Sequence, residues 1–348
     1  MIRKFNGVAV AVLALFAAAG AQAQSSVKLY GTIDLAFASI KPAYDPSNKP
    51  ATPSISSGLM TTSYIGFAGS EDLGGGLKAE FALESFVGAD DGSNVSNNGG
   101  KFWSRASNIA LSSASFGKVA LGQYDNPLFT FGYTYDAFGS SMAFAPTMRH
   151  YNYIGQTGYG TGFDTGWVNS VTYESPVVAG FQAIGQYAAK ESTAAGTHNS
   201  YTVAASYNNG PLSAMLTYVN AGYTNANSAY TANQKDWDLG ASYDFGVAKA
   251  FGQYTDIKDQ DATGGTKQTA KNYQLGVTVP LNDKAAVMAS FGSQKFTQAS
   301  GKTTDKIFTV GYDYTLSKRT DVYGAFSTNS QTSKESGQTA VVGIKHNF

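Results

Sequence analysis

The chain contains no cysteine among its 348 residues. Disulfides, thiolate-bound metals and catalytic thiols are therefore excluded, and the fold must be held by packing and backbone hydrogen bonds. An excess of charge of one sign is also lacking, because 24 basic residues balance 24 acidic ones. A near-neutral chain does not offer the basic surface that nucleic-acid binding requires, so we expect no nucleic-acid partner.

Long apolar runs are missing from the chain after residue 23, where no segment holds the roughly 20 apolar residues that a membrane-spanning helix requires. Glycine, tyrosine and phenylalanine are plentiful, at 39, 22 and 21 residues. This combination leaves two classes of protein. One is a soluble all-β protein, and the other is a transmembrane β-barrel whose apolar residues alternate with polar ones.

The N-terminus has the features of an export signal. Arg3 and Lys4 precede an apolar run over 8–20, and the small-x-small sequence of 21–23 follows. This pattern predicts a cleaved secretory signal peptide over 1–23 and a mature domain over 24–348. A membrane-anchoring helix is the alternative, but the apolar run is too short for it.

Alternation of apolar and polar residues is the strongest local pattern in the mature chain. Between Val27 and Phe37 the odd positions are mostly apolar, whereas the even positions include Lys28 and Asp34. A period of two predicts a strand with one apolar and one polar face. Sixteen such segments are found, at 27–37, 64–69, 77–85, 109–111, 118–124, 169–173, 181–187, 201–207, 212–219, 237–243, 247–254, 273–279, 285–291, 307–314, 321–326 and 339–348.

The connections between these segments alternate in length. Short turns rich in glycine, asparagine, aspartate or proline are found at 71–76, 113–117, 175–180, 208–211, 244–246, 280–284 and 317–320. Long polar connections lie between them, at 41–62, 88–101, 190–200, 220–235 and 256–271. Outer-membrane barrels have this asymmetry, with short periplasmic turns and long external loops. The pattern therefore predicts an all-β fold, a transmembrane antiparallel β-barrel of sixteen strands, in preference to a soluble sandwich.

Aromatic residues recur near the predicted strand ends. They fit interfacial girdles, in which the ring stays apolar and a hydroxyl group reaches lipid headgroups, although a buried soluble core could also hold them. These residues are Tyr30, Phe37, Tyr187, Tyr207, Tyr218, Tyr243, Tyr254, Phe291, Tyr312, Tyr314 and Tyr323.

Several stretches resemble a known family. SSVKLYGTIDLAF, GSEDLGGGLKAEF, FGKVALGQYD, NSVTYESP, YTLSKRTDVYGAFS and VVGIKHNF are similar, in this order over nearly the whole mature chain, to the trimeric general porins of betaproteobacteria. The resemblance implies a homotrimer of sixteen-stranded barrels in the outer membrane of a Gram-negative bacterium. It also implies passive diffusion of ions and small hydrophilic solutes, and contact with outer-membrane lipid and lipopolysaccharide.

The longest connection spans 125–166 and is rich in phenylalanine and tyrosine. Connections of this length are usually functional or disordered, and the aromatic content favours a folded loop. In the resembling porins, the connection after the fifth strand folds inward and narrows the pore. We therefore expect an inward-folded constriction loop after strand 5, with Asp136 supplying an acidic group by resemblance.

Charged residues of the lumen should set ion selectivity, because sixteen strands leave an aqueous channel and fixed charges across a narrow gap select ions. With the apolar face outward, Lys78 also belongs to the wall. The candidates for the pore lining and the constriction are Lys28, Asp34, Glu80, Glu84, Arg105, Asp125, Asp136 and Arg149.

Arg105 presents a conflict. It follows Phe102 in the F-x-x-R pattern with which the resembling porins place a pore-facing arginine, yet it shares the parity of the apolar residues Ile109 and Leu111. Simple alternation would turn it outward. The alternative is that Ala106, Asn108 and Ala110, which have the opposite parity, pack outward at a trimer interface. Arg105 would then face the pore, and we expect it to line the pore.

The sequence departs from anion-preferring members of the resembling family. They often read S-R-x-G on the second strand and G-R on the fifth, where this chain has Tyr64 and Gln123 in place of the arginines. Loss of these positive charges, together with Glu80 and Glu84, predicts a weakly selective or mildly cation-preferring pore.

Catalysis is the main alternative, since some outer-membrane barrels are lipases or proteases. The three histidines, His150, His198 and His346, are not in a G-x-S-x-G context. We expect no enzyme, no cofactor and no metal site.

The chain ends on Phe348, which shares one strand face with His346, Ile344 and Val342. We expect this final strand to pair with the first and close the barrel, with the terminal ring at the periplasmic interface. By resemblance, Phe348 is also a signal that the outer-membrane assembly machinery reads. The simpler interpretation is a buried strand end.

Overall fold

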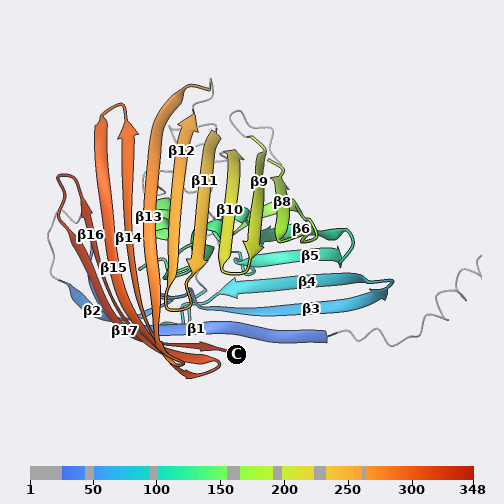
Figure 1. Ribbon diagram of the computed structural model, residues 1–348, viewed down its shortest axis with the longest axis horizontal. Coiled ribbons are helices and arrows are strands. Elements are labelled where there is room, and N and C mark those ends of the chain that lie inside the picture. Colours follow the sequence, from blue (N-terminus) through green and yellow to red (C-terminus); the bar gives the residue numbers. More distant parts are fainter. Residues whose placement is uncertain are drawn as a thin grey trace, which may run out of the picture.

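The computed structural model describes residues 26–43, 51–94, 101–154, 165–190, 198–222, 233–260 and 264–348. Figure 1 shows strands that follow one another in chain order around a barrel wall, with the C-terminal end beside β1. The expected signal peptide of 1–23 lies outside the described residues.

Sixteen strands of the described chain form the barrel. They are β1 (Ser26–Lys41), β3 (Tyr64–Gly74), β4 (Leu77–Phe86), β5 (Ala106–Ser113), β6 (Gly117–Asp125), β7 (Gly166–Glu174), β8 (Phe181–Ala188), β9 (Ser200–Asn209), β10 (Leu212–Gly222), β11 (Asn233–Asp244), β12 (Lys249–Gln260), β13 (Thr266–Asn282), β14 (Ala285–Gln298), β15 (Gly301–Ser317), β16 (Thr320–Gln331) and β17 (Gly337–Asn347). Each strand pairs antiparallel with the next, and β1 pairs with both β3 and β17, so the ladder closes. Each of the sixteen predicted segments overlaps one of these strands, which confirms the predicted architecture.

One strand was not predicted. β2 (Thr52–Ser57) lies within the expected connection 41–62 and pairs antiparallel with the second half of β1, from Ile40 to Leu35. Its sequence, TPSISS, has a single large apolar residue and is mostly exposed, so it has no alternation by which it could be recognised.

Strands β12 to β15 are longer than predicted at the end opposite the short turns. The expected connection 256–271 is largely strand, because β12 extends to Gln260 and β13 begins at Thr266. Most of the added residues are polar, with Ile257 and Phe296 as the large apolar exceptions, and apolar alternation therefore did not mark them. This part of the barrel extends beyond its apolar band.

The barrel is apolar outside and polar inside. On β1, Leu29 and Phe37 are 55% and 59% exposed, whereas Thr32 and Asp34 on the other face are buried. The same division holds on β13, where Leu275 is 69% exposed. An apolar exterior around a polar interior is the arrangement of a transmembrane barrel and argues against a soluble all-β protein.

Two of the expected girdle residues face the interior instead. Tyr323 is 2% exposed and donates its hydroxyl hydrogen to Asp34 over 2.6 Å, and Tyr30 donates its own to Glu84. Tyr30 has the even parity of the polar positions on β1, which is the physical reason for this correction. Several other girdle residues are exposed on the outer face, namely Phe37, Tyr187, Tyr243, Phe291 and Tyr312.

The described part of the connection over 125–166, which includes residues 126 to 154, folds into the barrel. It contains α2 (Pro127–Thr134) and α3 (Pro146–Ile154). Asn126 caps α2, because its side-chain oxygen accepts from the Leu128 backbone N–H over 2.8 Å, and a proline follows in the first turn. α2 contacts β9, β10 and β11, and α3 contacts β13, β14 and β15. The prediction of an inward-folded loop after the fifth barrel strand is confirmed.

Among the described residues, no helix has the length and hydrophobicity needed to cross a membrane.

The last residue completes the closure of the barrel. The backbone N–H of Phe348 donates to the Gly31 carbonyl over 3.1 Å, and the Gly31 N–H donates to the Phe348 carbonyl over 3.3 Å. A Cβ at residue 31 would lie 2.7 Å from Phe348 Cζ, so the terminal ring covers a position that only glycine leaves free. The predicted pairing of the first and last strands is confirmed.

Candidate functional site

Three consecutive side chains of α3 hold the loop against the wall, and each of them hydrogen-bonds to a residue on a different strand. Arg149 donates to Ser327 on β16 (3.1 Å), His150 Nε2 meets Asp305 on β15 (3.0 Å), and Tyr151 donates its hydroxyl hydrogen to Asp238 on β11. Burial lowers the pKa of His150 to about 3, with a smaller contribution from the neighbouring Arg149 charge. The imidazole is therefore neutral, and its Nε2 shares a hydrogen bond with the carboxyl group of Asp305.

Asp136 also faces the wall rather than the open lumen. It is 4% exposed and accepts hydrogen bonds from the Phe138 backbone N–H over 2.9 Å and from the Ser290 hydroxyl of β14 over 3.2 Å. Burial raises the pKa of Asp136 to about 7. Its placement differs from the expected position in the constriction, because the turn between the helices directs the carboxyl group toward β14.

Further contacts extend the anchorage around the barrel. Asn126 donates to Gln186 on β8 over 3.0 Å. The Tyr135 hydroxyl hydrogen-bonds to the Ser213 hydroxyl on β10 over 3.2 Å. Gln253 on β12 donates to the Gly132 carbonyl over 3.1 Å. The loop is thus held along the wall from β8 to β16.

Apolar packing accompanies these bonds and explains the aromatic content of the loop. Leu128 and Phe131 are fully buried in a cluster that includes Val219 and Ile257 of the wall. A second cluster joins Phe144 and other residues of the loop to Met60, Tyr323 and Val341. Burial of each large side chain contributes about 1.5 to 3 kcal/mol, so the loop is a packed part of the barrel.

The open part of the lumen lies along β1 and β3 to β6. A cavity of about 380 Å³ is lined there by six charged residues, namely Lys28, Glu80, Glu84, Arg105, Lys118 and Asp125. A second cavity of about 640 Å³ lies toward the short turns, is lined by Lys78 and Glu174 among others, and shares Glu80 and Lys118 with the first. The shared residues make the two cavities adjoining parts of one passage.

Most of the lining charges are paired. Arg105 forms an ion pair with Glu84, and its guanidinium lies over the Tyr64 ring, 4.4 Å from the centroid. Lys118 Nζ lies 2.7 Å from a Glu80 carboxylate oxygen, whose other oxygen accepts from Ser112 over 2.9 Å.

Two lining charges are left without such a partner. Neither Lys28 nor Asp125 forms an ion pair with another described residue. The lining as a whole therefore carries three basic and three acidic groups, with no excess of either sign.

Arg105 reaches the lumen although its parity predicts the opposite. β5 begins at Ala106, so Arg105 lies just before the regular ladder and its side chain is not bound by the alternation. Ala106 and Ala110 are 4% exposed and line the same cavity, whereas Ile109 is 59% exposed on the outside. The alternative in which the small residues of β5 pack outward is wrong.

Gln123 supports the backbone that carries Arg105. Its side chain is buried and donates to the Ser104 carbonyl over 2.9 Å and to the Arg105 carbonyl over 3.3 Å. Sequence reasoning noted Gln123 only as a missing arginine. Its position on β6 opposite Ser107 of β5 was the signal that could have identified this role.

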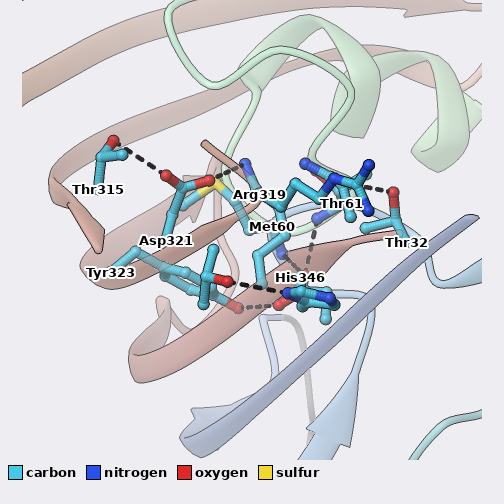
Figure 2. Close-up of polar contacts among 12 residues, drawn as sticks. Thr32, Met60, Thr61, Thr315, Arg319, Asp321, Tyr323 and His346 are labelled. Atoms are coloured by element: carbon cyan, nitrogen blue, oxygen red, sulfur yellow. Dashed lines mark hydrogen bonds and ion pairs between the residues drawn. The ribbon is translucent and has the colours of Figure 1, made fainter. Parts of the chain in front are cut away.

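Asp34 is a structural tether rather than a free lining charge. It is fully buried and accepts from the Met60 and Thr61 backbone N–H groups over 2.7 and 2.8 Å and from the Tyr323 hydroxyl. Figure 2 shows this region, where Met60, Thr61 and Tyr323 converge close to the seam between β1 and β17. The connection after β2 covers the Asp34 carboxyl group. The alternation along β1 predicts the face of Asp34 but not this cover.

A second group of polar contacts lies beside this tether on the closing strands. Asp321 accepts from the Thr315 hydroxyl over 3.0 Å (Figure 2), and it also pairs with Lys345 over 3.4 Å. His346, on the outer face, contacts the Thr320 hydroxyl over 2.9 Å through Nδ1. The Asp321–Lys345 pair and the Thr320–His346 contact join β16 to β17 on the inner and outer faces of the wall, and the Thr315 bond joins β15 to β16.

A closed barrel with an apolar exterior, a charged open passage and a loop packed against one side of the lumen defines the class: this is a channel of the outer-membrane barrel type. A family model described as Gram-negative porin matches residues 9–334, and the chain belongs to this family of outer-membrane proteins. It forms a water-filled channel through the outer membrane.

Known relatives cover nearly all of the chain. Outer membrane porin protein 32 of Delftia acidovorans is 35% identical, over 98% of this chain and 99% of the relative. An outer membrane porin protein of Bordetella pertussis is 30% identical, with the same two coverages. Among solved structures, an anion-selective porin from Comamonas acidovorans superimposes with a TM-score of 0.79 and 28% identity, over 93% of this chain and 100% of that one.

Proposed function

We propose that the protein is a passive channel with weak charge selectivity for ions and small hydrophilic solutes. The observation that carries this proposal is the balanced lining of the open passage, where Glu84 pairs with Arg105 and Glu80 pairs with Lys118. A lining that favours one sign needs an excess of fixed charge, which these pairs do not supply. The pairing of both glutamates favours weak selectivity over a cation preference.

The neutral residues Tyr64 and Gln123 support the same conclusion. They occupy the two positions where anion-preferring porins often have arginine, so the anion selectivity named for the Comamonas porin does not extend to this chain in our proposal. Lys28 carries a positive charge outside these pairs, and Asp125 carries a negative one in the lining of the same cavity.

We also propose that the chain is exported by a signal peptide over 1–23 and assembles as a homotrimer in contact with lipopolysaccharide. Family membership supports the trimer. We further propose that Phe348 is read by the assembly machinery, which its position at the seam and partial exposure would allow.

Catalysis is not part of the proposed function. A hydrolase needs a nucleophile and a base that substrate can reach. His150 is buried between α3 of the loop and the wall, against Asp305, and His346 lies on the outer face beside Thr320. Hydrolysis of phospholipid by the purified protein, at a rate that heat denaturation abolishes, would overturn this part of the proposal.

Proteoliposome swelling tests the proposed selectivity. Vesicles containing the protein should swell at similar rates in isotonic neutral, anionic and cationic solutes of equal size, and empty vesicles should not swell. A more than about tenfold preference for one sign of charge would contradict a balanced passage, since a single unpaired charge in water changes such ratios less than that.

A further inference from the structure

Two aspartates of β11 are completely buried where the loop meets the wall. Asp236 and Asp238 are both 0% exposed. They lie two residues apart on one strand, so alternation turns both side chains inward. Tyr151 of α3 donates its hydroxyl hydrogen to one oxygen of Asp238. The aspartate pair, defined as Asp236 with Asp238, therefore lies directly beside the loop.

Three of the four carboxylate oxygens of the aspartate pair have no hydrogen-bond partner. Both oxygens of Asp236 and the second oxygen of Asp238 are buried without a donor. Among the described residues, no lysine, arginine or histidine forms an ion pair with either aspartate. An ionised carboxylate that is buried without a donor or a counter-charge costs several kcal/mol. The pair therefore needs a positive charge that the described part of the chain does not supply.

Two buried hydroxyl groups flank the aspartate pair. Thr217 of β10 and Thr255 of β12 are the cross-strand partners of Asp238 on its two sides. Both threonines are 0% exposed, and neither hydroxyl oxygen has a hydrogen-bond partner. Side chains directly opposite each other on neighbouring strands have Cβ atoms about 4.5 to 5.5 Å apart. Carboxylate and hydroxyl oxygens without partners are thus gathered on three adjacent strands.

A third aspartate adds negative charge close to the pair. Asp259 of β12 is 2% exposed, and one of its carboxylate oxygens has no partner. It lies two residues along β12 from Ile257, which is the cross-strand partner of Asp236. Like charges that are buried this close repel each other strongly, and a cation between them would remove the repulsion.

The spacing of the aspartate pair allows both carboxylates to reach one ion. Residues two apart on a strand are separated by about 6.6 Å. Two calcium–oxygen distances of about 2.3 to 2.6 Å add up to about 5 Å, which the carboxyl groups can span by leaning toward each other. Among the described residues, no group of three or more aspartate, glutamate or histidine side chains is arranged to hold a metal ion. The remaining ligands would therefore be neutral oxygens, with Asp259 contributing only through its charge.

We propose that Asp236 and Asp238 bind one calcium ion between α3 and the barrel wall. Calcium takes oxygen ligands in a flexible geometry, and two carboxylates balance its charge. Magnesium demands a near-ideal octahedron and keeps several waters, which suits a packed position less well. This departs from the expected absence of a metal site, since the two aspartates occur in no recognisable metal-binding motif.

The bound cation would strengthen the anchorage of the loop. One oxygen of Asp238 accepts from Tyr151, and the other would be a ligand of the ion. The ion thereby fixes the carboxyl group to which α3 is bonded. Removal of calcium should consequently loosen the loop and leave the barrel intact.

Calcium binding by the purified full-length protein tests the proposal. The protein is refolded in neutral detergent, stripped with EDTA and brought to equilibrium by dialysis against radioactive calcium in 0.1 M potassium chloride. Asp236→Asn removes one carboxylate and keeps the shape of the side chain. Asp283→Asn is the matched control, because it removes an equal charge from an exposed position in a short turn at the other end of the barrel.

The wild type and the control variant should each bind one calcium ion per chain, and Asp236→Asn should bind calcium at least about tenfold more weakly. Absence of bound calcium in the wild type would overturn the proposal and assign the missing positive charge to a proton. Equal binding by Asp236→Asn, or an equal loss in the control variant, would also overturn it. Displacement of calcium by potassium at 0.1 M would do the same, because the site would then prefer a monovalent ion.

Terbium luminescence locates the ion within the barrel. Tb³⁺ replaces calcium at oxygen ligands and emits when a tyrosine or tryptophan beside it is excited. Tyr151 is bonded to Asp238, and Trp237 separates the two aspartates in the sequence. Emission should therefore be strong in the wild type and in the control variant, and excess calcium should abolish it. Emission that persists in excess calcium, or that is unchanged in Asp236→Asn, would place the ion elsewhere and refute the site.

Proteolysis of the loop gives a readout that does not depend on the variants. Calcium should slow cleavage of the loop in the wild type relative to EDTA, at least about twofold, with the barrel intact in both. Equal cleavage rates would refute the anchoring role. If Asp236→Asn does not refold, which heat-modifiable migration on a gel detects, calcium binding, terbium emission and loop protection of the wild type still decide the question.

Discussion

Removal of one partner of the Lys118–Glu80 ion pair should change the ion selectivity of the passage by a predictable amount. The two side chains are 30% and 29% exposed and lie where the two lumen cavities meet. Each therefore remains hydrated and ionised when its partner is replaced by glutamine. Lys118→Gln leaves the lining with one extra negative charge, and Glu80→Gln leaves it with one extra positive charge.

The size of the change follows from Coulomb's law. An ion that passes about 7 Å from a unit charge in water interacts with it by about 0.6 kcal/mol. Screening at 0.1 M salt, with a Debye length of about 10 Å, halves this to about 0.3 kcal/mol. A cation gains this energy and an anion loses it, so Lys118→Gln should shift the permeability ratio about threefold toward cations.

Reversal potentials across planar bilayers measure this ratio. Glu80→Gln should shift it by a similar factor toward anions, and the double variant should return to the wild-type value. At 1 M salt, where the Debye length is about 3 Å, both shifts should nearly vanish. Single variants that shift in the same direction, or that change nothing at 0.1 M, would show that ions do not pass this pair.

Three further predictions concern the loop and the chain end. Burial raises the pKa of Asp136 to about 7, so the stability that its protonated form contributes is present below about pH 4 and is lost as the pH rises toward 7. Asp136→Asn should therefore weaken the pH dependence of thermal unfolding between pH 4 and 8. An unchanged pH dependence would contradict the burial argument. Tyr151→Phe removes a hydrogen bond to buried Asp238 and should destabilise the loop by about 1 to 3 kcal/mol. The measurement is faster proteolysis of the loop while the barrel stays intact. A proteolysis rate equal to that of the wild type would count against this hydrogen bond as an anchor of the loop. Deletion of Phe348 should abolish insertion in cells while refolding in detergent is retained, and loss of refolding as well would assign the terminal ring a structural role only.

The barrel could be predicted from the sequence because its outer face needs apolar residues at every second position. The period of two identified sixteen strands and placed Lys28, Glu80 and Glu84 on the inner face, where the structure also has them. The pairing of the first and last strands followed from the ending VVGIKHNF. These features depend on local pattern and on the requirement that a membrane barrel has no free edge.

The parts that could not be predicted depend on contacts between distant segments. Parity gave the face of Asp34 but not the connection after β2 that covers it with Met60 and Thr61. Parity also failed at Arg105, because this residue lies one position outside the ladder of β5.

The anchorage of the loop had no sequence signal at all. His150, Tyr151 and their partners Asp305 and Asp238 lie 155 and 87 residues apart, and none of them occurs in a recognisable motif. Long-range pairs of this kind become visible only when the loop is placed against the wall.

The central claim, a water-filled passage with a balanced lining, is tested most directly by single-channel recording with ion substitution. The purified wild-type protein should insert in conducting steps, and under a tenfold gradient of potassium chloride its reversal potential should stay near zero. Absence of conducting steps would contradict the channel. A potential close to the limit of about 59 mV for one ion alone, of either sign, would contradict the balanced lining.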